Sequence, residues 1–179
     1  MWNQQIDTTH IQPLLSWQGL QIVPGLNAIS GDEGSGKTRL LRDLAQTMGH
    51  EALWLDLRLP EHDQKTPQAF WLHMQAQCPR WNTGLQNDLI KALHLQAHVD
   101  KQLFMLSAGS RRKVGLLALL ASGVTVTCLD QPYAALDRVS VHVLQDFLSD
   151  MAEHPTRAWL IADYEADPEL PWSTHITLT

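Results

Sequence analysis

The sequence predicts an α/β fold in which helices flank a mostly parallel β-sheet, and three observations predict it. Short apolar segments typical of buried strands alternate with longer amphipathic segments typical of helices along most of the 179 residues. One apolar segment, residues 26–30, leads into a glycine-rich turn that an amphipathic helix follows. Neither an internal repeat nor a linker rich in Gly and Ser interrupts the pattern, so we expect a single domain over residues 1–179.

The N-terminal part is expected to be irregular at first and then to form a β-hairpin. Residues 1–19 are polar, and the first seven of them have neither the basic nor the apolar region of a secretory signal peptide. Residues 20–23 and 26–30 are apolar, and Pro24-Gly25 between them is a strong turn signal. We therefore predict an antiparallel hairpin whose second strand leads into the glycine-rich turn.

The glycine-rich turn matches the phosphate-binding P-loop pattern G-x-x-x-x-G-K-T. It consists of Gly31, Asp32, Glu33, Gly34, Ser35, Gly36, Lys37 and Thr38. Its glycines let backbone N–H groups surround phosphate oxygens, Lys37 supplies positive charge for the β- and γ-phosphates, and the Thr38 hydroxyl can bind Mg²⁺. The helix predicted from residue 39 to about residue 48 would present its N-terminus to the phosphates. Asp32 and Glu33 are expected to point outward and to weaken nucleotide binding somewhat by repulsion.

The middle of the chain predicts one strand and two helices. Residues 52–57 have an apolar strand pattern that Pro60 ends. Thr66 followed by Pro67 has the form of a helix N-cap with proline at the first helical position, and a second helix is predicted over about residues 85–98. The apolar residues expected on the buried faces are Phe70, Trp71 and Met74 in the first helix and Leu85, Leu89, Ile90 and Leu93 in the second.

The third part of the chain predicts an apolar helix, a buried strand, another helix and two more strands. Val114–Ala121 is the apolar helix, and the strand that follows at residues 124–129 ends in Asp130. A helix to about Met151 and strands at residues 158–162 and 175–178 complete the pattern. The run from residue 114 to residue 129 is too short and too interrupted to span a bilayer, so any membrane contact is expected to come through a partner.

Charge, cysteines and histidines limit the functions that the chain can have. The net charge of −6 is unlike that of a nucleic-acid-binding protein, and the cluster 111–113 (Arg-Arg-Lys) is too small to supply a basic face. We expect that cluster to be a solvated helix turn, with contact to nucleotide on another subunit as the alternative. Cys78 and Cys128 lie in no C-x-x-C motif, and the apolar strand pattern around Cys128 indicates that this residue is a buried thiol. His94 and His98 are spaced i, i+4 on the predicted helix, but further ligands nearby are lacking, so we do not expect a metal there.

Besides the P-loop, three segments form an ordered series: Leu106–Ser110 (L-S-A-G-S), then Val126–Asp130, then Ala134–Asp137. With the P-loop in front, they resemble the L-S-G-G-Q signature, the Walker B strand and the D-loop of the ATP-binding subunits of ABC transporters. Residues 97–101 also resemble the usual lead-in to that signature, and the resemblance covers about residues 18–165. It implies the fold of an ABC ATPase, in which residues 66–101 would be a reduced helical subdomain.

The resemblance implies a dimer, with itself or with a second ABC subunit, that binds ATP and Mg²⁺ in two composite sites. The P-loop of one subunit would hold the nucleotide, and Ser107 with the N–H groups of Ala108 and Gly109 of the other would cover the γ-phosphate. Thr38 and Asp130 would bind Mg²⁺, and Asp137 would contact the P-loop of the other subunit. The implied nucleotide contacts are Gly31, Asp32, Glu33, Gly34, Ser35, Gly36, Lys37, Thr38, Arg39, Ser107, Ala108, Gly109 and Asp137.

The resemblance also implies a membrane permease as the partner, and therefore a cytoplasmic position on the inner face of the membrane. Nucleic acid is not expected as a partner. Phe70, Trp71 and Trp81 could form an apolar patch that docks the permease, or could pack inside the small helical subdomain. In this family the permease chooses the substrate, so this chain does not identify it.

Two positions tied to catalysis depart from the family pattern. Gln131 stands where the family has a glutamate that activates the attacking water, and an amide cannot accept a proton at neutral pH. Asp163 stands where the family has its switch histidine, and its charge would repel the γ-phosphate unless it turns away. Slow ATP hydrolysis is therefore expected.

Two further family positions stay open, and so does the choice between several functions. Arg58 or Gln64 would serve as the Q-loop residue, and Trp17 or Trp2 would stack on adenine unless these tryptophans belong to the core. The short spacing between P-loop and signature and the L-S-A-G form look most like the ATP-binding subunit of the cytochrome c maturation haem exporter. The alternatives are a non-hydrolysing module that pairs with a competent ABC subunit or regulates assembly, and a non-transport ABC ATPase acting on nucleic acid or ribosomes, for which the expected long inserts or tandem domains are missing.

Overall fold

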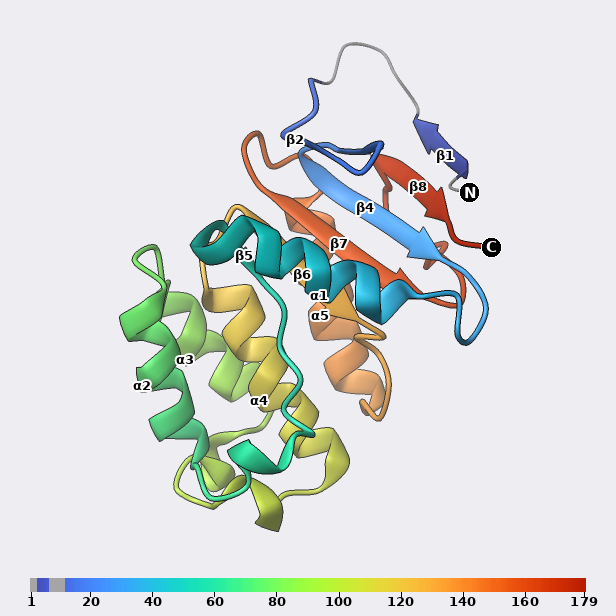
Figure 1. Ribbon diagram of the computed structural model, residues 1–179. Coiled ribbons are helices and arrows are strands. Elements are labelled where there is room, and N and C mark those ends of the chain that lie inside the picture. Colours follow the sequence, from blue (N-terminus) through green and yellow to red (C-terminus); the bar gives the residue numbers. More distant parts are fainter. Residues whose placement is uncertain (1–2, 7–11) are drawn as a thin grey trace. The chain divides into compact units, whose positions relative to one another are not determined.

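The computed structural model describes residues 3–6 and 12–179, and these fall into two compact units (Figure 1). The sheet unit comprises residues up to Trp54, Thr125–Pro132 and Leu144–Thr179. The helical unit comprises Leu55–Val124 and Tyr133–Val143. The chain therefore passes from one unit to the other several times.

The sheet unit is built on a six-stranded sheet with the order β1-β8-β4-β7-β6-β5. The strands are β1 (Asn3–Ile6), β4 (Gly25–Ser30), β5 (Ala52–Leu53), β6 (Val126–Asp130), β7 (Ala158–Asp163) and β8 (Thr174–Thr177). All neighbours are parallel except β1, which pairs antiparallel with β8. The mostly parallel sheet predicted from the alternating pattern is therefore confirmed, although residues 3–6, expected to be irregular, contribute its edge strand.

Helices cover both faces of this sheet. Leu40, Leu41 and Leu44 of α1 (Lys37–Met48) pack into one core cluster with alternate residues of β7, including Leu160. Trp159, the residue before Leu160, points to the other face, where Phe147 of α5 (Arg138–Met151) meets its ring edge-on with the ring centroids 6.3 Å apart. A one-turn 3₁₀ helix, η1 (Gly49–Glu51), follows α1.

The antiparallel hairpin is present, but it lies one strand earlier than predicted. Strands β2 (Leu15–Trp17) and β3 (Leu20–Ile22) pair with each other, and β3 does not pair with β4. Gln18 and Gly19 both have positive φ, which suits the tight turn between the paired strands. At Pro24-Gly25 the Asn27 side chain instead bonds the N–H and the carbonyl of Val23, and this corner turns β4 into the main sheet.

The helical unit packs two helices on a third. α2 (Pro67–Gln77) and α3 (Thr83–Ala92) contact α4 (Ala108–Ala121), and short 3₁₀ turns lie at η2 (Pro60–His62), η3 (Gln96–His98) and η4 (Leu103–Met105). Thr66 caps α2 by accepting the Ala69 N–H at 3.2 Å, as its sequence predicts. Phe70 and Trp71 are each only 2% exposed, and the Trp71 indole N–H bonds the Val114 carbonyl. These two rings therefore pack inside the unit.

Three predicted elements are shorter or longer than expected. The strand predicted over residues 52–57 pairs only as Ala52–Leu53, and Asp56 closes a turn farther on by accepting the Arg58 N–H. The helix predicted over residues 85–98 ends at Ala92, because His94 takes a left-handed backbone with φ 56°. His94 and His98 therefore do not share a helix face. α4 begins at Ala108, earlier than residue 114. No helix within residues 3–6 and 12–179 is long and apolar enough to cross a membrane.

Candidate functional site

The P-loop connects the carboxyl end of β4 to the N-terminus of α1. Gly31, Gly34 and Gly36 all have positive φ, and Gly36 is the N-cap of the helix with φ 96°. A side chain at that backbone angle would be strained, so the glycine allows the loop to turn into α1. The loop therefore has the strand–turn–helix context that its sequence motif requires.

Lys37 lies inside this loop. The residue is 7% exposed, and its Nζ donates to the carbonyl oxygens of Gly31 at 2.5 Å and Asp32 at 2.7 Å. The ring of Tyr164 covers the ammonium, with its centroid 5.1 Å from Nζ. The positive charge is thus held at the centre of the loop, where phosphate oxygens bound by the loop N–H groups would meet it.

The other predicted residues of the loop are accessible. Asp32, Glu33 and Thr38 are exposed, so both acids have room to stay in solvent. Arg39 is also exposed and pairs along α1 with Asp43 at 3.4 Å. The structure gives Arg39 a partner within the helix and none in the loop.

Strand register brings the predicted Mg²⁺ and catalytic residues to the sheet edge that carries the P-loop. Ser30, the last residue of β4, aligns with Asp163 of β7, and Ala162 of β7 aligns with Asp130 of β6. With strands ~5 Å apart, Asp130 is about 10 Å across the sheet from the end of β4. Gln131 follows with φ 44°, and its N–H donates to the Ala162 carbonyl at 2.7 Å.

At the end of β7, Asp163 and the residue after it, Tyr164, make contacts that the sequence did not predict. The Asp163 carboxylate accepts the backbone N–H of the next residue, Tyr164, at 2.8 Å. The Tyr164 carbonyl accepts the Gly31 N–H at 3.4 Å, and its ring lies against Lys37. An aromatic residue directly after the switch position was the only sequence signal for this contact.

The signature segment forms the start of α4 in the helical unit. Ser107 is the N-cap, and its Oγ accepts the Ser110 N–H at 3.1 Å. Ala108 and Gly109 occupy the first turn, where backbone N–H groups have no intrahelical acceptor. A Cβ on Gly109 would lie 2.6 Å from the carbonyl oxygen of Ala135 in the D-loop, so only glycine permits this approach.

Asp137 joins the D-loop to α4. Its carboxylate accepts the Lys113 Nζ at 2.5 Å and the Ser140 N–H at 2.9 Å, so it also caps the start of α5. The Lys113 ammonium, and then the Ser140 N–H, hold the pKa of the Asp137 carboxyl well below its usual range. The Lys113 side chain is only 10% exposed, so this ion pair is largely shielded on the lysine side.

Arg111 and Lys113 correct the prediction of a solvated basic turn. The Arg111 side chain is 15% exposed, pairs with Asp63 at 2.7 Å and donates to the Leu57 carbonyl at 2.5 Å. Both cations are therefore partners within the helical unit. The sequence shows these charges, but it does not show which distant residues they contact.

The remaining candidates have other neighbours. Arg58 forms a two-point contact with Asp56, and the Gln64 side chain accepts from Gln102 at 3.0 Å. Trp17 is half-buried against the main core cluster, which favours the core interpretation, and Trp2 lies outside the described residues. Cys78 and Cys128 are both buried free thiols, and burial was predicted only for Cys128. Within the part of the chain that the structure describes, no group of three or more His, Cys, Asp or Glu could hold a metal ion.

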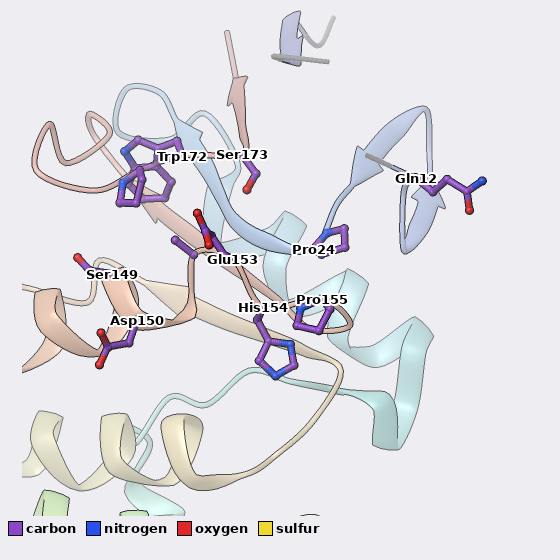
Figure 2. A pocket seen from close by; sticks show the side chains of 11 residues that line it. Gln12, Pro24, Ser149, Asp150, Glu153, His154, Pro155, Trp172 and Ser173 are labelled. Atoms are coloured by element: carbon purple, nitrogen blue, oxygen red, sulfur yellow. The ribbon is translucent and has the colours of Figure 1, made fainter. Parts of the chain in front are cut away.

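A hollow of about 850 Å³ lies at the opposite edge of the sheet (Figure 2). Pro24, Pro155 and Ser173 line it, and each lies just before the strand it leads into, at the amino ends of β4, β7 and β8. His154 also lines it, with Nδ1 accepting the Arg157 N–H, and burial lowers the His154 pKa. Because the P-loop follows the carboxyl end of β4, this hollow is separate from the phosphate site.

The fold and the carboxyl edge of the sheet define a P-loop nucleotide-binding protein with the motif order of ABC ATPases. No protein-family model matches the chain. The cytochrome c biogenesis ATP-binding export protein CcmA of Pseudomonas syringae pv. syringae is 30% identical over 149 aligned residues, which cover 70% of this chain and 69% of that protein. The chain therefore belongs to the family of ABC transporter ATP-binding proteins, which includes this relative.

Two further relatives are also ATP-binding transport proteins by name, and two solved structures share the fold. CcmA of Hyphomonas neptunium is 27% identical over an alignment covering 96% of this chain and 100% of that protein. The aliphatic sulfonates import ATP-binding protein SsuB of Granulibacter bethesdensis is 28% identical, with 94% and 73% covered. A solved cobalt transport ATP-binding protein superposes with a TM-score of 0.68 at 22% identity, covering 83% of this chain and 62% of the other. An ABC transporter ATP-binding protein from Pyrococcus furiosus has a TM-score of 0.66 at 17% identity, covering 89% and 88%.

Proposed function

We propose that this chain binds ATP with Mg²⁺ in a site shared by two ABC subunits and couples ATP binding, with slow hydrolysis, to a membrane permease. The observation that supports this most is the P-loop itself. Lys37 is held at its centre by two loop carbonyls, on the sheet edge that also carries Asp130. Loop N–H groups and Lys37 would bind the β- and γ-phosphates, and Thr38 and Asp130 would hold Mg²⁺.

The second subunit would complete the site with its signature segment. Ser107, Ala108 and Gly109 stand at the first turn of a fourteen-residue helix, where N–H groups and the helix dipole favour a phosphate. We also propose that Asp137 contacts the P-loop of the other subunit. In this chain its carboxylate already holds the D-loop to Lys113, which would fix how the D-loop is presented.

Hydrolysis should be slow because the catalytic positions lack their usual chemistry. The Gln131 amide can orient a water molecule but cannot accept its proton. Loss of a general base typically costs ~10²–10⁴ in rate. The Asp163 carboxylate accepts the N–H of Tyr164, and it supplies no histidine imidazole to the site.

We propose the permease partner on the basis of the relatives' names. Their names describe export and import ATP-binding proteins, and the two CcmA relatives favour a cytochrome c biogenesis exporter. The chain would then act on the cytoplasmic face of a membrane, attached through its permease. Residues 66–101 would be the reduced helical subdomain within one ABC domain.

Phosphate release by the purified chain tests the proposal together with calorimetric measurement of ATP affinity. ATP should bind, phosphate release should be slow, and Gln131→Glu should raise it by up to about 10²-fold while leaving affinity similar. Gln77→Glu, a matched change on an exposed residue of α2, should change neither. Rapid hydrolysis by the wild-type chain, or no ATP binding, would contradict the proposal.

The second candidate is a non-hydrolysing module that pairs with a competent ABC subunit or regulates assembly. Gln131 together with Asp163 favours it, because both catalytic positions are altered while the P-loop remains intact. This candidate predicts ATP-dependent dimerisation, with itself or with the second subunit, and no phosphate release even from Gln131→Glu. Phosphate release from Gln131→Glu distinguishes it from the first candidate, because both candidates predict dimerisation with ATP, which light scattering measures.

A further inference from the structure

We propose that Tyr164 is a further residue of the nucleotide site, one that caps Lys37 and competes with phosphate for its ammonium group. The inference rests on the proposed ATP binding at the P-loop. It assigns this role to the residue directly after Asp163, the position that was expected to act at the γ-phosphate.

The first support is the geometry around Lys37. Its ammonium donates to two loop carbonyls on one side, and the Tyr164 ring lies 5.1 Å away. Ring faces attract cations electrostatically, so this contact stabilises the ammonium where it is. A phosphate group that binds Lys37 must share or replace that contact.

The second support is that Tyr164 is anchored to the loop by its backbone. Its carbonyl accepts the Gly31 N–H at 3.4 Å, and its own N–H donates to the Asp163 carboxylate at 2.8 Å. These two bonds fix the start of the side chain beside the P-loop. Tyr164 as a whole is 52% exposed, which leaves solvent space into which its ring can move when phosphate arrives.

The third support is charge. If Asp163 faced the loop, its carboxylate would repel phosphate. Because that carboxylate is bonded to the Tyr164 N–H, the side chain that reaches Lys37 is a neutral ring. A ring that covers a cation weakens anion binding without blocking it. An exposed cation–π contact corresponds to an effect of about two- to five-fold on affinity.

Affinity measurements on three variants of the full chain test the cap. Tyr164→Leu should bind Mg-ATP about two- to five-fold more tightly, because the ring no longer competes. Tyr164→Phe should bind like the wild type, since it keeps the ring. Phe104→Leu, an aromatic residue of similar exposure in the helical unit, should also bind like the wild type. A purely structural role for Tyr164 would give weaker binding in Tyr164→Leu.

A spectroscopic readout follows the ring directly. The chain has only two tyrosines, Tyr133 and Tyr164, so 3-fluorotyrosine labelling gives two ¹⁹F resonances that Tyr133→Phe assigns. Mg-ATP should shift the Tyr164 resonance at the concentration at which calorimetry detects binding.

Four outcomes decide the matter. A shifted Tyr164 resonance with tighter binding by Tyr164→Leu supports the cap. Equal weakening in Tyr164→Phe and Tyr164→Leu overturns it, because the hydroxyl would then bind phosphate. ATP binding that leaves the resonance and the Tyr164→Leu affinity unchanged overturns it while the proposed function stands. Absence of ATP binding overturns both.

Discussion

The two units hold their nucleotide-binding segments in different ways. In the sheet unit, the P-loop is shaped by its own glycines, and Lys37 bonds carbonyls only five and six residues away. In the helical unit, the start of α4 depends on residues that are distant in sequence. Arg111 reaches Asp63, and Lys113 reaches Asp137.

A motif can therefore be complete in sequence and still depend on residues outside it. Apart from the contacts of Gly31 and Lys37 with Tyr164, the geometry of the P-loop is local, so changing its residues should affect binding more than stability. The signature segment is positioned by ion pairs, so changing those ion pairs should affect stability of the helical unit first. Substitutions in each unit, and the reactivity of one cysteine in each, test this contrast.

Lys37→Met should weaken ATP binding by about 10- to 100-fold, because it removes a charge-assisted bond to phosphate worth ~1.5–3 kcal/mol. Calorimetry measures the affinity, and urea denaturation should show stability close to that of the wild type. Lys91→Met, on an exposed residue of α3, serves as the control. Unchanged affinity in Lys37→Met would mean that the P-loop is not the phosphate site.

Arg111→Met should destabilise the helical unit by about 1–3 kcal/mol, because it leaves the Asp63 carboxylate and the Leu57 carbonyl without their donor. Urea denaturation followed by circular dichroism measures the loss. Arg42→Met, an exposed residue of α1, should have little effect. Equal stability of the two variants would show that the contacts of Arg111 do not stabilise the helical unit.

Asp137→Asn should lower the melting temperature at neutral pH and lose that effect in acid. The Asp137 pKa is depressed in the folded chain, so its contribution is present above the ordinary value of 3.8 and is lost as pH falls through the lower folded value. The difference in melting temperature between wild type and variant should therefore shrink below about pH 4. A difference that stays constant down to pH 3 would exclude the ion pair as its source.

The two cysteines give the smallest effect, one in each unit. Burial raises the pKa of Cys128 in β6 to about 12, and it also raises the pKa of Cys78 in the helical unit. Both thiols should react slowly with iodoacetamide in the native chain, and Cys128 more slowly, since it is 1% exposed against 6% for Cys78. Peptide mapping by mass spectrometry measures the two rates, and faster labelling of Cys128 would reverse the expected order of local stability.

Much of the fold was predictable because alternating strand and helix patterns are local. The P-loop, the Thr66 cap and the strand ending at Asp130 fall where their sequences place them. The hairpin was misplaced because the Pro24-Gly25 turn signal does not reveal that Asn27 bonds back to Val23 and redirects the chain.

The site was predictable where it is a motif and unpredictable where it joins distant residues. The contact between Lys37 and Tyr164 and the ion pair of Lys113 with Asp137 connect different elements. Periodicity and spacing carry no information on such pairs. The burial of Arg111 was missed for the same reason, because Asp63 lies in another segment.

The close approach of Gly109 to Ala135 has a consequence for how this signature can vary. The family pattern has two successive glycines, and this chain has alanine at the first of them. Ala108 is exposed, so its methyl group meets no neighbour that would resist it. A methyl group at position 109 would collide with the Ala135 carbonyl. Within this chain, position 108 therefore tolerates a residue other than glycine, whereas position 109 requires glycine because the D-loop lies beside it.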